Sequence, residues 1–221
     1  MEVRELYEEL QKRLGKQNWW PTKSNNEEEE ILIGAILTQQ TKWENVEKAI
    51  NNLMRSNLLS LDRIVSVPLR QLEELIRPCG FARVKAKRLK QVAKLVLKRY
   101  SSLGDLLALP LDSARKALLE LPGIGYETCD AILLYAGNKP IFVVDRYTHR
   151  LFVRLGLWKG NYSYERLRKF VEARLPREVA IYKEFHALID VFAKRICAAD
   201  PRCESCFLRN DCKRFKEGRK R

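Results

Sequence analysis

The chain has 221 residues, of which 46% are apolar and 32% charged, the composition of a globular protein with one large domain or two small lobes. No apolar run approaches the roughly 20 residues that a membrane-spanning helix needs, and the charged first residues lack the apolar segment of a secretion signal. A soluble protein inside the cell is expected, and its formal net charge of +14 favours a polyanionic partner.

Most of the sequence is typical of short amphipathic helices interrupted by Pro, Gly or Asn. Asn26 is expected to cap a helix that begins with four glutamates and continues through apolar residues to Leu37. Only residues 141–144 have the character of a strand, and one strand cannot form a sheet. An all-α fold is therefore predicted, with further helices near 43–55, 68–76, 83–100, 111–120, 126–136, 145–155, 163–174 and 178–196.

The positive charge is concentrated toward the end of the chain. Residues 1–30 hold eight acidic and five basic side chains, whereas residues 194–221 hold four acidic and ten basic ones. Such clustering favours sequence-independent binding to phosphates. A lysine- and arginine-rich solvated surface, as in thermophile proteins, is the alternative explanation.

A glycine-containing turn lies between two of the predicted helices and consists of Leu121, Pro122, Gly123, Ile124 and Gly125. Glycines permit positive φ and let backbone N–H groups approach a ligand closely, and the following helix directs its positive end at the same anion. The turn is a candidate phosphate site, with a plain tight connection as the alternative. Farther along, the apolar residues 141–144 lead into Asp145, which is either a functional carboxylate near this turn, a helix N-cap, or both.

Four cysteines lie in the basic segment at the end of the chain, with spacers of five, two and five residues: Cys197, Cys203, Cys206 and Cys212. In a reducing compartment these thiols are expected to bind a metal rather than to form disulfides. The two histidines lie outside the set, so the candidates are a tetrathiolate zinc site and an iron–sulfur cluster. One CxxC pair flanked by single cysteines favours a [4Fe–4S] cluster. Cys79 and Cys129 are each interpreted as a buried, small apolar side chain.

Turn, aspartate and cysteines, in this order, resemble the endonuclease III superfamily of DNA glycosylases, and the resemblance extends from Ile31 to Cys212. It implies a two-lobed helix-hairpin-helix fold that acts on damaged bases in double-stranded DNA during base excision repair. Residues 1–30 with 141–221 would form one lobe and residues 31–140 the other. Asp145 would be the catalytic carboxylate, and the four cysteines would bind a C-terminal [4Fe–4S] cluster. The first cysteine spacer is one residue shorter than is usual in the family.

Glu127 occupies the hairpin position at which the bifunctional endonuclease III branch has a nucleophilic lysine. A carboxylate cannot form an imine with the sugar. The resemblance therefore implies a monofunctional glycosylase without AP lyase activity. A first-turn glutamate favoured by the helix dipole is the alternative interpretation of Glu127.

A second set of residues resembles the 3-methyladenine DNA glycosylase branch: Trp-Trp-Pro, the sequence LTQQT with Trp43 soon after, Gly80-Phe81 and Glu127. The resemblance implies that a base pocket is lined by Trp19, Trp20, Pro21 and Trp43 and that Glu127 is needed for activity. Indole faces suit a flipped, positively charged base through stacking and cation–π attraction. Ordinary core packing is the alternative for each tryptophan.

Three further residues are expected to contact DNA. Gln39 occupies the position at which the family has a glutamine that fills the space left by the flipped base. Lys85 and Arg88 recur on a predicted helix as candidate phosphate contacts, with a solvated helix face as the alternative. The protein is expected to be a monomer in the cytoplasm, associated with the nucleoid in a prokaryote.

Two other functions compete with a glycosylase for alkylated bases. One keeps the fold and changes the substrate to oxidised pyrimidines, or to adenine opposite an oxidised guanine. The other is a helix-hairpin-helix DNA-binding protein without activity, whose metal site is only structural. The lone carboxylate Asp145 favours an enzyme, because a protein that only binds DNA needs no acid beside the sugar.

Overall fold

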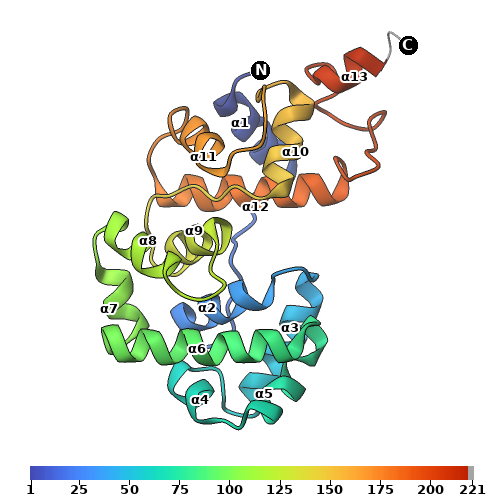
Figure 1. Ribbon diagram of the computed structural model, residues 1–221. Coiled ribbons are helices and arrows are strands. Elements are labelled where there is room, and N and C mark those ends of the chain that lie inside the picture. The colour runs from blue at the N-terminus through green and yellow to red at the C-terminus, as the bar shows by residue number, and fades with distance from the viewer. Residues whose placement is uncertain (219–221) are drawn as a thin grey trace. The chain divides into compact units, whose positions relative to one another are not determined.

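The computed structural model describes residues 1–218, and these contain helices and no strand (Figure 1). The predicted all-α fold is thereby confirmed. The chain divides into two compact units, Met1–Trp19 with Pro140–Arg221, and Trp20–Lys139. The sequence had suggested lobe boundaries after residues 30 and 140. No helix within the described range has the length and apolar character required to cross a membrane.

The unit formed by residues 20–139 is built around α2 (Glu27–Leu37). Residues 30–37 of this helix are all buried, since it is apolar around its circumference and packs on α3, α6, α7 and α9. The longest helix, α6, covers α4 and α5. The remaining bounds are α3 (Trp43–Arg55), α4 (Leu61–Ser66), α5 (Leu69–Leu75), η1 (Arg77–Cys79), α6 (Ala82–Tyr100), α7 (Leu103–Ala108), α8 (Leu111–Leu119) and α9 (Tyr126–Tyr135).

The start of α2 also fixes the segment before it. Asn26 caps the helix by accepting a hydrogen bond from the Glu29 N–H at 3.3 Å, as the sequence predicted. The buried Glu30 carboxylate accepts hydrogen bonds from the backbone N–H groups of Lys23 and Ser24 at 2.7–3.0 Å. A buried carboxylate needs such donors. These bonds hold the chain that carries Trp20 against α2.

The other unit is centred on α12 (Val179–Arg195), which packs on α1 (Val3–Leu14) and α10 (Arg146–Leu155). Phe142, Tyr182 and Phe185 form an aromatic core with ring centroids 5.6–5.8 Å apart. Residues 141–144, which had strand character, are fully buried but unpaired, and the Phe142 N–H donates to Glu172 Oε1 at 2.9 Å. The remaining helices are α11 (Tyr164–Glu172) and α13 (Lys213–Gly218).

The helices predicted from hydrophobic periodicity begin and end within two residues of the observed bounds. No range was predicted for α1, of twelve residues, or for α4, α7 and α13, each of six residues. Six residues span less than two turns, which is too short for a 3.6-residue period to show.

Candidate active site and cysteine pocket

Asp145 is the N-cap of α10 and is only 7% exposed. Its Oδ1 accepts hydrogen bonds from the Thr148 N–H at 2.7 Å and from the Thr148 hydroxyl at 2.8 Å. The N-terminal end of the helix adds a favourable field for the charged carboxylate. The N-cap interpretation is confirmed, and these two bonds hold the carboxyl group in one orientation.

His186 of α12 lies beside the second oxygen of this carboxyl group, with Nε2 3.8 Å from Asp145 Oδ2. The imidazole is 6% exposed and stacks on Trp19, with ring centroids 5.6 Å apart. Burial lowers the pKa of His186, while the charges of Asp145 and Asp190 act in the opposite direction. No local pattern predicted this neighbour, because the contact joins residues that are far apart along the chain.

The glycine turn is held by two residues that were predicted to contact DNA. Gly123 has φ +74°, and a Cβ there would overlap the Arg88 side chain, so both the backbone and the space require glycine. Gln39 donates from Nε2 to the Gly123 carbonyl and to Thr128 Oγ1, both at 3.1 Å, and its Oε1 accepts from Arg88 Nη1. Gln39, Arg88 and the turn therefore form one network.

An ion pair joins the two helices of the hairpin, α8 and α9. Arg115 donates to both carboxylate oxygens of the fully buried Asp130, at 2.7 and 3.1 Å. The same guanidinium lies 5.2 Å from the centre of the half-exposed Tyr126 ring. Glu127 is exposed in the first turn of α9. A bidentate pair of this kind holds α8 and α9 in one relative geometry, so the glycine turn between them is held in a fixed position.

Three of the four predicted base-pocket residues line one pocket within residues 20–139. Trp20 meets Trp43 edge to face, with centroids 5.2 Å apart, and packs over Gly34. These side chains border a space of about 240 Å³ that includes open solvent. The complete lining is Trp20, Pro21, Lys23, Glu30, Gly34, Trp43, Glu47 and Ile50. Trp19 does not line this pocket and packs on His186 in the other unit.

Lys85 requires a correction, because the structure buries it to 3% exposure. Its ammonium donates to the carbonyls of Leu37 and Cys79, both at 2.8 Å, at the ends of α2 and η1. Burial lowers the pKa of Lys85. The side chain satisfies backbone acceptors and cannot reach a phosphate. On the same helix, Lys87 is exposed.

We expect Lys85→Met to lower the free energy of unfolding by about 2–4 kcal/mol, because two buried carbonyl groups lose their donor. Lys87→Met is the matched control and should be nearly neutral. Urea unfolding measures both changes. The slope of log K for DNA binding against log salt concentration should stay the same in Lys85→Met. A reduced slope would show that Lys85 does contact a phosphate.

One exposed aromatic side chain was not assigned a role by the sequence analysis. Phe81 is 65% exposed, precedes α6 with φ 48°, and follows Gly80, which also has positive φ. A left-handed backbone is uncommon for a bulky residue. The signal that could have drawn attention to it is an aromatic residue directly after a glycine at a helix start.

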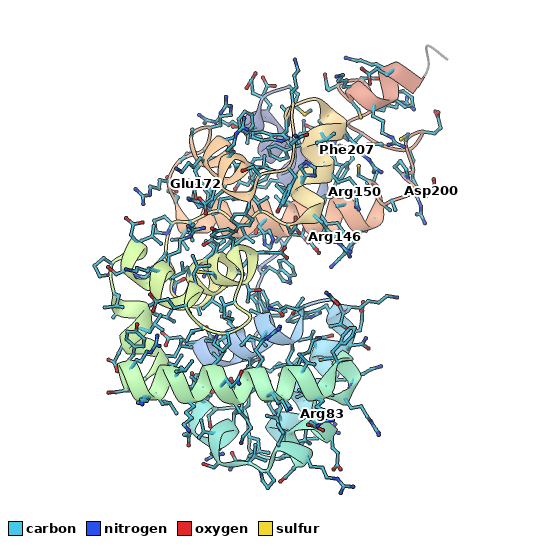
Figure 2. All side chains as sticks on the ribbon, in the orientation of Figure 1. Arg83, Arg146, Arg150, Glu172, Asp200 and Phe207 are labelled. Atoms are coloured by element: carbon cyan, nitrogen blue, oxygen red, sulfur yellow. The ribbon has the colours of Figure 1, made fainter. Side chains whose placement is uncertain are left out.

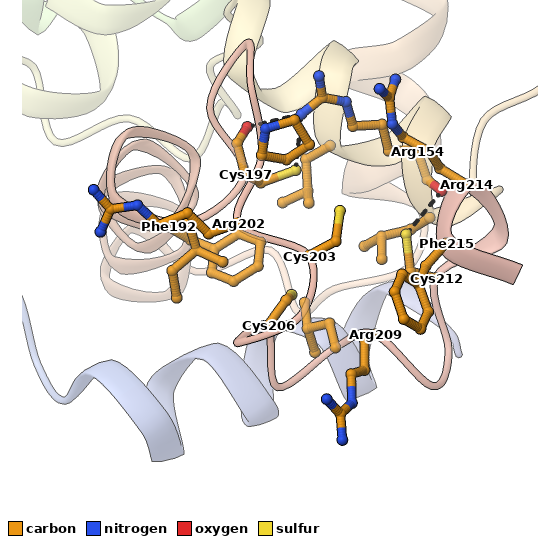
Figure 3. A pocket seen from close by; sticks show the side chains of 15 residues that line it. Arg154, Phe192, Cys197, Arg202, Cys203, Cys206, Arg209, Cys212, Arg214 and Phe215 are labelled. Carbon is orange, nitrogen blue, oxygen red and sulfur yellow. Dashed lines mark hydrogen bonds between the residues drawn. The ribbon is translucent and has the colours of Figure 1, made fainter. Parts of the chain in front are cut away.

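The four cysteines of the C-terminal segment line a single pocket, whose empty space including open solvent is about 380 Å³ (Figure 3). Burial raises the pKa of Cys206, and the nearby thiols of Cys197, Cys212 and Cys203 raise it further. Within residues 1–218 no three His, Cys, Asp or Glu side chains lie close enough to hold one metal ion. The other lining residues are Leu151, Arg154, Leu155, Phe192, Ile196, Pro201, Arg202, Leu208, Arg209, Arg214 and Phe215.

Two arginines of α10 tie the cysteine segment to that helix. Arg154 Nη1 donates to the Cys197 carbonyl at 3.0 Å and lies 3.3 Å from its Sγ, while Nη2 donates to the Ala199 carbonyl at 3.0 Å. Arg150 donates to the same Cys197 carbonyl at 3.1 Å, and it lies on α10 after Arg146 (Figure 2). The Cys212 thiol donates to the Arg154 carbonyl at 3.3 Å. Both ends of the cysteine segment thus rest on α10.

An all-helical chain with a supported glycine turn between two helices and a buried N-cap carboxylate has the features of a helix-hairpin-helix DNA glycosylase. The model of the HhH-GPD superfamily of base excision DNA repair proteins matches residues 33–177. This chain belongs to that superfamily, within the endonuclease III superfamily of enzymes, and is a DNA glycosylase.

Known proteins resemble the chain over most of its length. A protein of Methanocaldococcus jannaschii provisionally named a DNA repair glycosylase is 42% identical over 95% of both chains. A 3-methyladenine DNA glycosylase of Helicobacter pylori, solved with 1,N6-ethenoadenine, is 30% identical with a TM-score of 0.77, over 88% of this chain and 98% of that one. An endonuclease III solved with DNA has a TM-score of 0.84 at 24% identity, over 99% and 97% of the two chains, which shows the shared fold.

Proposed function

We propose that this protein is a monofunctional DNA glycosylase that hydrolyses the N-glycosidic bond of alkylated bases of the 3-methyladenine type in double-stranded DNA. The observation that carries the proposal is the pocket of Trp20, Pro21 and Trp43 in the unit formed by residues 20–139. The similarity to the Helicobacter pylori enzyme supports the same substrate class.

The chemistry of this pocket favours a positively charged base. Two indole rings meet at right angles at its wall, and the carboxylates of Glu30 and Glu47 outnumber the single ammonium of Lys23. Stacking on indole holds any flipped base, and cation–π attraction adds selectivity for a cationic one. Alkylated purines such as 3-methyladenine carry this charge, and their glycosidic bond is already weak.

Asp145 is the proposed catalytic residue. Departure of the base leaves positive charge on the deoxyribose, by analogy with glycoside hydrolysis. A carboxylate held in a fixed orientation stabilises that charge and orients or deprotonates the attacking water. Since Thr148 engages Oδ1, Oδ2 is the oxygen assigned to the reaction.

The hairpin network is the proposed DNA contact. Backbone N–H groups near Gly123 and Gly125 and the N-terminal end of α9 favour a phosphate. Gln39 is hydrogen-bonded to this turn. On DNA it would give up those bonds and occupy the space that the flipped base leaves in the duplex. The exposed Phe81 ring is an apolar side chain of the kind that inserts between base steps.

The cysteine pocket is proposed to hold a [4Fe–4S] cluster. Four cysteines on one pocket, its mostly apolar walls and the arginines nearby fit a negatively charged cluster. Cys197, Cys203, Cys206 and Cys212 would be the ligands. When bound, the cluster would fix the basic segment on α10 and take no part in bond cleavage.

The proposed function is tested with a panel of duplexes that carry single damaged bases. Release of 3-methyladenine is expected, and release of oxidised pyrimidines is not. Efficient release of an oxidised pyrimidine, or of adenine opposite an oxidised guanine, would contradict the proposed substrate. It would assign the protein to the branch of the superfamily that acts on the released base. Retention of DNA without release of any base would favour a protein that only binds DNA.

We expect Trp43→Ala to lower kcat/KM for 3-methyladenine release roughly 10- to 100-fold, since stacking contributes about 1–3 kcal/mol per base. Trp43→Phe keeps an aromatic face and should retain most of the activity. Unchanged release in Trp43→Ala would show that the pocket does not receive the base.

Borohydride trapping on abasic DNA is expected to give no covalent adduct, because the hairpin position of the nucleophilic lysine holds Glu127. Gel electrophoresis detects an adduct as a slower band. A stable adduct would show that another lysine attacks the sugar and that the enzyme is bifunctional.

A further inference from the structure

His186, Asp190 and Lys194 form a row of ionisable side chains on one face of α12 that ends at Asp145. They are spaced by four residues, so they lie above one another on the helix. Lys194 is 47% exposed and pairs with Asp190 at 2.8 Å, while His186 is buried beneath them. The row links the surface of the unit to the proposed catalytic carboxylate.

The contact with Asp145 involves the oxygen that Thr148 leaves available. Thr148 occupies Oδ1 with two hydrogen bonds, and His186 Nε2 lies 3.8 Å from Oδ2. At this distance a proton on the imidazole creates an ion pair with the carboxylate. The Trp19 ring, 5.6 Å away, stacks on the imidazole and holds it beside Asp145.

We propose that His186 is a positioning residue that keeps Asp145 ionised as the pH falls, and so extends base release into the acid range. The proposal rests on the proposed function of Asp145. An imidazole that gains a proton as the pH falls places a positive charge 3.8 Å from Asp145 Oδ2. An opposite charge within about 4–6 Å lowers the pKa of a carboxyl group by roughly one unit or more.

The neighbouring charges act on His186 with opposite signs. Burial lowers its pKa, Asp145 and Asp190 raise it, and Lys194 lowers it. At neutral pH the imidazole is therefore uncharged, and the ion pair forms only on acidification.

The decisive experiment measures single-turnover release of 3-methyladenine by His186→Gln and the unaltered enzyme from about pH 4 to about pH 8. We expect the acid limb of the profile to move about one pH unit higher in His186→Gln, a roughly tenfold loss of rate in acid with little change at neutral pH. His149→Gln, which removes the other histidine of the chain, should keep the original limb. An unmoved limb in His186→Gln would overturn the proposal.

Stability provides a readout with the opposite sign. A histidine whose pKa is lowered by folding destabilises the protein as the pH falls below the unfolded value of 6.5. His186→Gln should therefore lose less stability between neutral and acid pH than the unaltered protein. A purely structural role would reduce stability at every pH and leave the acid limb in place.

A titration that needs neither activity nor a folded His186 variant completes the test. The imidazole of His186 is followed by NMR in the His149→Gln background, with and without Asp145→Asn. We expect its pKa to fall when the Asp145 charge is removed, and an unchanged pKa would refute the coupling. Coupling together with full base release by Asp145→Asn would instead reject the proposed function and leave the pair intact.

Discussion

Asp145→Asn is expected to reduce base release roughly 10³-fold while the protein stays folded. Asparagine is as good an N-cap as aspartate, and its carbonyl oxygen can still accept the two bonds from Thr148. The substitution removes the charge that would offset the cation on the sugar and leaves the local structure in place. Single-turnover release of 3-methyladenine measures the effect, and thermal unfolding verifies the fold.

Asp145→Ala separates the two roles of this residue. Alanine also removes the helix cap, which costs about 1 kcal/mol of stability. The alanine and asparagine variants should thus be equally inactive, and only the alanine variant should be less stable. An asparagine variant with more than about a tenth of the normal rate would be too active for a missing catalytic carboxylate.

The proposed cluster would give the protein a brown colour and four iron atoms per chain. Cys206→Ser is expected to abolish the colour and to lower the iron content well below four atoms, because the proposed cluster would lose one of its four ligands. The segment from Cys197 to Cys212 would then lose its internal cross-link. Closing a loop of about 15 residues is worth about 3 kcal/mol. We therefore expect Tm to fall by roughly 6–12 °C, measured together with iron analysis and visible absorbance.

Cys129→Ala is the matched control, since this buried thiol belongs to the unit that does not contain the pocket. It should leave the iron content unchanged, although it removes a buried side chain. A colourless protein with one equivalent of zinc would replace the proposed cluster by a zinc site. Full iron content in Cys206→Ser would exclude this cysteine as a ligand.

Features set by neighbouring residues could be predicted from the sequence. The helices predicted from periodicity, the Asn26 cap, the N-cap role of Asp145 and the glycine turn each depend on a few consecutive side chains. The apolar segment 141–144 was given strand character, but the partners of its backbone groups were not predictable. The Phe142 N–H of this segment donates a hydrogen bond to the side chain of Glu172, from a helix farther along the chain.

Contacts between distant segments could not be predicted. Lys85 looks like its exposed neighbour Lys87 in the sequence, yet it is buried under two carbonyl groups that only the packing of α2 and η1 brings together. Trp19 and Trp20 are adjacent and were assigned to one pocket, but they pack on different partners. His186 sits in an apolar helix, where nothing local marks a neighbour of Asp145.

Helix α10 connects the proposed chemistry and the cysteine pocket within ten residues. Asp145 caps its first turn, while Arg150 and Arg154 in its later turns donate hydrogen bonds to the cysteine segment. A helix of this length moves as a stiff rod, so a shift at one end displaces the other. Oxidative injury to the proposed cluster is accordingly expected to slow bond scission indirectly, by displacing Asp145, as well as to weaken binding of the substrate.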